Sequence, residues 1–113
     1  MSDEKRVYHA LLVYKHAKML SKGRDLEVYK IASLLHDEGK EVNDEDHEIF
    51  SLIKVKKYFG NNPDKELEAV IKDCVLNHRS SGTPLTVQGR IFQQADILAK
   101  KDPEWIKFKE RIK

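Results

Sequence analysis

The 113-residue sequence contains a single cysteine, so no internal disulfide can form within the chain. This scarcity is compatible with a reducing cytosol, and we expect the protein to be cytoplasmic. Cys74 stands within the mostly apolar segment 69–76. In that setting a small buried hydrophobic residue is the expected role, rather than a nucleophile.

Long hydrophobic runs and a surplus of one charge are also missing. No apolar run approaches the length of a membrane span, and the first six residues lack the apolar stretch of a signal peptide. The chain has 21 Lys and Arg against 19 Asp and Glu, a net charge of +2. A dedicated nucleic-acid binder usually shows a concentrated basic face, so this composition argues against that class.

No segment alternates apolar and polar residues with the period of a strand, whereas apolar residues recur with helical spacing throughout. We therefore predict an all-α fold, a compact single-domain bundle of five to six helices over residues 1–113. The expected helices cover about 3–21, 25–37, 43–59, 63–78 and 86–100, with a short last one from Asp102. Expected helix starts include Asp25, Asn43 or Asp44 as caps and Pro63 at a first helical position.

Apolar periodicity also predicts which faces of these helices are buried. The main stripe of the first helix is expected to be Val7, Ala10, Leu11, Tyr14 and Ala17, widened by Leu12, Val13, Met19 and Leu20. The second helix should bury Val28, Ile31, Ala32, Leu34 and Leu35. Near the end of the chain, Trp105, Ile106 and Phe108 can close the core or form a dimer contact, and core closure is preferred.

A histidine and an aspartate, His36 and Asp37, stand side by side where the apolar run of the second helix stops. Imidazole nitrogen and carboxylate oxygen both bind divalent cations. Neighbouring helix positions differ by about 100°, so both side chains can reach one ion only near a helix end. The pair taken alone also fits a helix that simply ends in polar residues.

Two further polar residues fall on apolar helix faces. Asp96 shares a face with Phe92 and Ala95, and a carboxylate buried there requires a basic residue, a hydrogen-bond network or a metal as partner. His9 precedes apolar residues three and four positions later, so it can point inward. His16 lies on nearly the same face, seven residues on, and is the rival candidate.

The order of these residues resembles the HD-domain superfamily of metal-dependent phosphohydrolases. The matching segments are His9 with an aliphatic residue three positions later, the apolar-apolar-His-Asp-x-Gly-Lys run at 34–40, and the basic-apolar-apolar run that ends in Ala-Asp at 90–96. His47 with Ser51, and the segment 78–81, look like intermediate motifs of small stand-alone HD hydrolases. The resemblance covers about residues 7–100.

This resemblance implies a divalent ion held by His9, His36, Asp37 and Asp96. Mixed nitrogen and oxygen ligands suit Mn, Co, Ni, Fe or Zn better than Mg. His47 and His78 can hold a second ion bridged by Asp37, or they can bind phosphate or donate a proton to the leaving group; the latter roles are preferred.

The same resemblance implies phosphate contacts and a class of substrate. The candidate phosphate-binding residues are Lys40, Arg79, Ser80 and Ser81. The expected activity is hydrolysis of a phosphomonoester, with a nucleotide as the favoured small substrate. The alternatives are an HD-type phosphodiesterase or nuclease on single-stranded nucleic acid, and a non-catalytic nucleotide-binding HD domain. No membrane partner is expected, and a homodimer stays open.

Overall fold

The computed structural model describes residues 3–37, 47–61 and 64–111, and for 3 and 47–50 it describes the backbone only. The described part contains six helices and no strand, which confirms the all-α prediction. The helices are α1 (Asp3–Leu20), α2 (Leu26–Leu35), α3 (His47–Phe59), α4 (Lys65–Leu76), α5 (Val87–Lys100) and α6 (Pro103–Arg111). None of these helices is long and apolar enough to cross a membrane.

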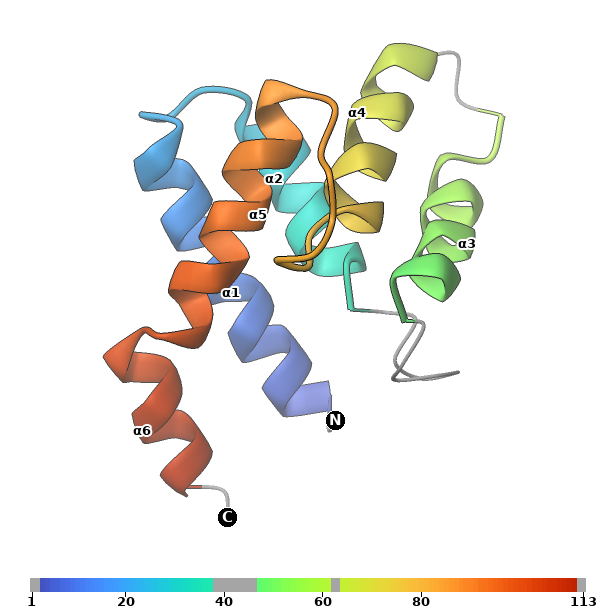
Figure 1. Ribbon diagram of the computed structural model, residues 1–113. Coiled ribbons are helices and arrows are strands. Elements are labelled where there is room, and N and C mark those ends of the chain that lie inside the picture. The colour runs from blue at the N-terminus through green and yellow to red at the C-terminus, as the bar shows by residue number, and fades with distance from the viewer. Residues whose placement is uncertain (1–2, 38–46, 62–63, 112–113) are drawn as a thin grey trace.

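Helix α2 lies at the centre of the arrangement and packs against α1, α3, α4 and α5 (Figure 1). The most extensive helix pair is α1 with α5, while α3 packs mainly on α4 and α6 contacts both α1 and α5. The Cα radius of gyration is 13.3 Å, close to the value of about 13 Å expected for a compact folded chain of this length. This arrangement brings α1, α4 and α5 around the end of α2.

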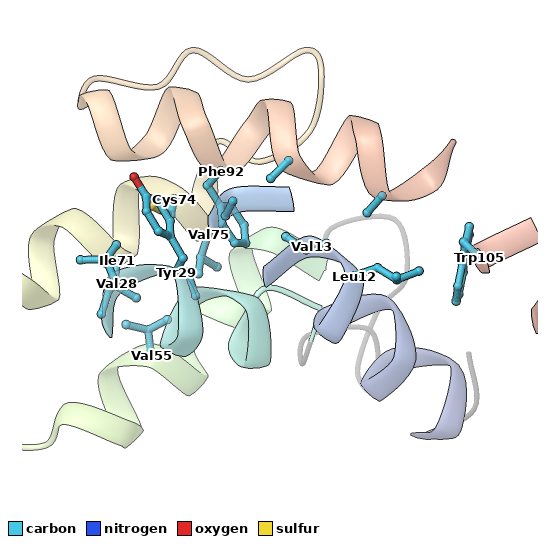
Figure 2. Close-up of a cluster of buried hydrophobic side chains, with 14 of the residues drawn as sticks. Leu12, Val13, Val28, Tyr29, Val55, Ile71, Cys74, Val75, Phe92 and Trp105 are labelled. Carbon is cyan, nitrogen blue, oxygen red and sulfur yellow. The ribbon is translucent and has the colours of Figure 1, made fainter. Parts of the chain in front are cut away.

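Buried hydrophobic side chains from all six helices form one core cluster, most of whose members are labelled in Figure 2. Cys74 is fully buried there, and burial raises the pKa of its thiol, so it is an unreactive core residue as predicted. Trp105 and Phe108 are also buried, which confirms core closure at the C-terminal end. Ile106 is 46% exposed and does not take part.

The predicted stripe of α1 is partly wrong. Val7 and Leu11 are 54% and 59% exposed, although apolar spacing suggested burial. The buried face runs through His9, Val13 and Ala17, which follow one another at intervals of four residues, and the burial of Val13 and Ala17 confirms that part of the prediction. This face is selected because α2 and α5 both pack on it, and Val7 and Leu11 lie on the opposite side of the helix.

The start of α2 also differs from expectation. Asp25 adopts a left-handed backbone with φ 53° and makes no side-chain capping bond. Its carboxylate instead accepts a hydrogen bond from Gln88 on α5, at 3.3 Å. Leu34, expected in the core, is 53% exposed because α2 buries the face that carries Tyr29 and Ala32.

The later helices begin at side-chain caps. Asp64 accepts from the backbone of Leu67 at 3.0 Å and caps α4, which begins at Lys65; Pro63, the predicted helix start, lies outside the described residues. Thr86 accepts from the backbone of Gly89 at 2.9 Å and starts α5 as predicted. The proposed caps of the third helix, Asn43 and Asp44, also lie outside the described residues.

The junction between α4 and α5 depends on one buried carboxylate, that of Asp73. It accepts hydrogen bonds from the backbone of Leu85 at 3.0 Å and of Thr86 at 2.9 Å, and from the Asn77 amide at 2.9 Å. Burial alone would raise the pKa of Asp73, but a hydrogen bond from the Thr86 hydroxyl, together with these donors, holds it below its ordinary value. On the other side, Gly89 lies so close that a Cβ there would collide with the Asp73 carboxylate.

We therefore expect Gly89→Ala to destabilise the protein, although alanine usually favours a helix. The added methyl group would displace Asp73 and overpack the junction, at a cost of about 1–3 kcal/mol in free energy of unfolding. Urea unfolding would measure the change, with the exposed-site variant Arg90→Ala as the control. A Gly89→Ala protein as stable as the wild type would contradict the close approach.

Candidate metal centre

The centre begins at the end of α2, where His36 caps the helix. The Nδ1 of His36 lies 2.8 Å from the carbonyl oxygen of Ser33, so this nitrogen carries the hydrogen and donates it. Ser51 on α3 donates its hydroxyl hydrogen to the carbonyl oxygen of His36 at 2.8 Å. The first bond orients the ring and the second holds the His36 backbone, and Nε2 is left as the ring nitrogen that can bind a ligand in the neutral form.

Side chains from three helical regions meet at this nitrogen. His36 Nε2 lies 3.2 Å from Asp37 Oδ2 and 3.6 Å from Asp96 Oδ1. His9 Nε2, from α1, lies 2.9 Å from the same oxygen of Asp96 and 3.7 Å from Asp37 Oδ2. All four side chains are buried, so the sequence-predicted set converges within the core.

When no cation is bound, the protonation states of the histidines and the carboxylates in this cluster depend on one another. Burial lowers the pKa of His36, but the carboxylates of Asp37 and Asp96 more than offset that effect and raise it to about 10. Burial raises the pKa of Asp96, yet hydrogen bonds from His36 and His9 hold it well below its usual range. A proton on His36 therefore compensates part of the negative charge of the two carboxylates.

His78, which follows the end of α4, lies on the other side of Asp37. Its Nδ1 donates to the carbonyl oxygen of Val75 at 2.6 Å, and its Nε2 lies 3.8 Å from Asp37 Oδ1. Burial and the positive charge of His36 lower the pKa of His78 to about 3, so its ring is neutral. The two oxygens of Asp37 thus face different histidines.

The remaining oxygen of Asp96 pairs with a lysine that sequence reasoning missed. Lys100 Nζ lies 3.0 Å from Asp96 Oδ2, and the two residues are four positions apart on α5. The lysine side chain is 57% exposed, whereas that of Asp96 is 2% exposed. The i,i+4 spacing in the sequence could have revealed this pair. Asp96 therefore has a basic partner on one oxygen and the histidine cluster on the other.

The two rival histidines of α1 have separate surroundings. His9 lies in the cluster, with its ring centroid 5.2 Å from that of Trp105 on α6. His16 lies 2.7 Å from Asp102, in a pair that joins α1 to the start of α6. The structure thus brings His9, and not His16, to His36.

The candidate phosphate-binding residues and His47 differ in burial, and some of them are not described by the structure. Arg79 is partly buried and Ser80 and Ser81 are exposed, in the turn that directly follows His78. Lys40 lies outside the described residues. His47 opens α3, and its side chain is also outside the description.

The donor atoms of this cluster fit a divalent ion. Ligand atoms of His9, His36 and Asp37 all lie within 4.8 Å of one another. Asp96 Oδ1 adjoins them, at 2.9 Å from His9 Nε2. Two imidazole nitrogens and two carboxylate oxygens would neutralise a doubly charged cation and leave coordination positions open. The cluster could therefore hold a metal ion in place of the proton on His36.

One comparison with known proteins gives a match. The HD domain family model matches residues 6–101, a stretch that contains every residue of the cluster. No curated protein and no solved structure matches the chain.

We expect metal affinity to rise with pH, because an ion must displace the proton from His36, whose pKa is raised to about 10. One displaced proton corresponds to about a tenfold gain in affinity per pH unit below that value. In the metal-free protein the raised pKa adds stability that is complete below about pH 6.5 and is lost as the pH passes about 10. The metal-bound form should not show that loss.

Fluorescence of Trp105, the only tryptophan, is a suitable reporter of binding because its ring adjoins His9. Mn and Zn titrations between about pH 6 and 8.5 would give the slope, with His16→Ala as a variant that should retain it. An affinity that does not change with pH would mean that no imidazole proton is displaced.

Proposed function

This chain belongs to the HD-domain family, and from that premise we propose that it is a metal-dependent phosphohydrolase acting on a phosphomonoester. The family consists in general of metal-dependent phosphohydrolases. The observation that carries the proposal is the buried convergence of His9, His36, Asp37 and Asp96 from separate parts of the chain. A nucleotide, or another small phosphate ester, is the proposed substrate, and the cytoplasm the proposed location.

These four residues are the proposed ligands of one ion. Their mixed nitrogen and oxygen atoms favour Mn, Co, Ni, Fe or Zn. An ion held there would supply Lewis acidity to a water molecule and neutralise negative charge on the phosphoryl oxygens. The carbonyl oxygen of Ser33 holds the His36 ring so that Nε2 faces the other ligands.

The surroundings of Asp37 support a second ion that it would bridge, since Oδ2 faces His9 and His36 while Oδ1 faces His78. The neutral His78 ring suits a ligand of a second ion, and its pKa of about 3 weighs against the role of proton donor. This argument favours the dinuclear alternative over the role that we preferred from the sequence. His47 stays a candidate ligand of the same second ion.

Arg79, Ser80 and Ser81 are proposed to bind the substrate phosphate, together with Lys40. The turn that carries the first three directly follows His78, so it begins beside the metal cluster. Guanidinium and hydroxyl groups are suitable donors to phosphate oxygens.

A homodimer is also proposed as an open alternative for the oligomeric state.

Hydrolysis of an aryl phosphate and of a panel of nucleotides, with each candidate metal, tests this function. We expect metal-dependent turnover of phosphomonoesters, lost in His9→Ala and largely retained in His16→Ala, because only His9 reaches the cluster. Faster cleavage of a bis-aryl phosphodiester or of single-stranded DNA would establish the phosphodiesterase alternative instead. Nucleotide binding without turnover under any metal would identify a non-catalytic domain.

Asp96→Asn separates a ligand role for Asp96 from a structural one. As a ligand, Asp96 is needed for the ion, so the variant should lose activity and most of the thermal stabilisation by Mn. The metal-free variant should stay folded, because Lys100 is exposed and the protonated His36 keeps Asp37 as its partner at 3.2 Å.

Thermal melts of both proteins in EDTA and in Mn give the comparison. A loss on the order of 3–5 kcal/mol that is the same with and without metal would instead indicate a structural ion pair.

A further inference from the structure

The segment between α4 and α5 is exposed at its centre but held firmly at its edges. The backbone N–H of Gly82 donates to the carbonyl oxygen of Arg79 at 2.8 Å and closes a tight turn over residues 79–82. A Cβ on Gly82 would lie 2.7 Å from the carbonyl oxygen of Asn77, so only glycine fits this close approach to the end of α4. The turn is therefore packed against α4 on one side.

Gln93 of α5 holds the turn from the other side. Its Nε2 donates to the carbonyl oxygen of Arg79 at 2.7 Å and to that of Gly82 at 3.0 Å. One amide nitrogen thus joins the first and last residues of the turn. Figure 1 shows this segment passing along α5 before the helix begins.

The turn is attached to the end of α4 and to Gln93 on α5, and both of these places lie close to the metal cluster. His78, immediately before the turn, faces Asp37. Gln93 lies three positions before Asp96 on α5, so the two side chains are on neighbouring positions of one helix face. Any shift of the turn relative to α5 would therefore change its position relative to the cluster.

We propose that Gln93 is a positioning residue for substrate phosphate. By holding residues 79–82 against α5, it keeps Arg79, Ser80 and Ser81 in place beside the metal cluster. A preorganised turn binds phosphate more tightly because less conformational freedom is lost on binding. The inference rests on the proposed phosphate-binding role of this turn. The alternative to this inference is a purely structural role, in which Gln93 only provides hydrogen-bond donors to two backbone carbonyl groups.

The test uses Gln93→Met, which keeps the length of the side chain and removes both donors. Calorimetry would measure the affinity of the Mn-loaded full chain for inorganic phosphate. We expect affinity to fall by about tenfold or more, equivalent to the loss of one charge-assisted hydrogen bond. The KM for an aryl phosphate should rise with a smaller change in kcat. Mn affinity, read from Trp105 fluorescence, should stay within about twofold because no proposed ligand is altered.

Gln94→Met is the matched control, since Gln94 is exposed on the same helix and should behave as the wild type. Gly82→Ala is a second, independent variant that disturbs the turn from the side of Asn77 while Gln93 is kept. It should weaken phosphate binding in the same direction. Hydrogen exchange of the backbone amide at position 82 should quicken in both Gln93→Met and Gly82→Ala, and this reports on the turn without any substrate.

The outcomes separate this inference from the proposed function. Wild-type phosphate affinity in Gln93→Met overturns the inference even if the wild type hydrolyses esters. A wild type that does not bind phosphate overturns it as well. Weaker phosphate binding in both turn variants supports it, even if no ester is hydrolysed and the proposed function fails. A lower melting temperature with unchanged phosphate affinity would assign Gln93 a structural role only.

Discussion

The burial of two carboxylates beside two imidazoles is the constraint on which the rest of the structure depends. Asp37 and Asp96 lie in the core, where ionised groups are costly without compensation. In the metal-free protein the compensation comes from a proton on His36 and from the exposed ammonium group of Lys100. A divalent ion would offer more positive charge at the same place. The cluster could therefore hold a divalent ion, and the family to which the chain belongs is one that binds such ions.

The apolar core holds these groups in position. Phe92 packs edge-on against the His36 ring with centroids 5.3 Å apart, and Trp105 adjoins His9 at 5.2 Å. These aromatic rings limit access of water and so strengthen the electrostatic interactions inside the cluster. Farther out, the buried carboxylate of Asp73 sets the start of α5, and through that helix the position of Asp96. Packing and charge thus act on the same few side chains.

Local signals predicted the helices well because they depend on neighbouring residues. Helix α5 starts directly after Thr86, close to the predicted start, and α2 ends where its apolar run meets His36. The predictions that failed concern features that residues close in the sequence do not determine. Val7 and Leu11 have helical spacing yet stay exposed, since only the packing of α2 and α5 decides which face of α1 is covered. Asp25 has a suitable side chain for a cap, but its left-handed backbone prevents that use.

The sequence by itself determined the ligand types, their helices and the order that relates the chain to its family. These are properties of side-chain chemistry and of a helical period, which a few residues define. The resemblance already favoured His9 over His16, but only the tertiary structure shows that His9 meets Asp96. His9 and Asp96 are separated by 87 positions and meet through helix packing. The tertiary structure also places the side-chain amide of Gln93, on α5, against the turn that joins α4 to α5. Such contacts depend on the angles and distances between packed helices, and no local pattern in the sequence contains them.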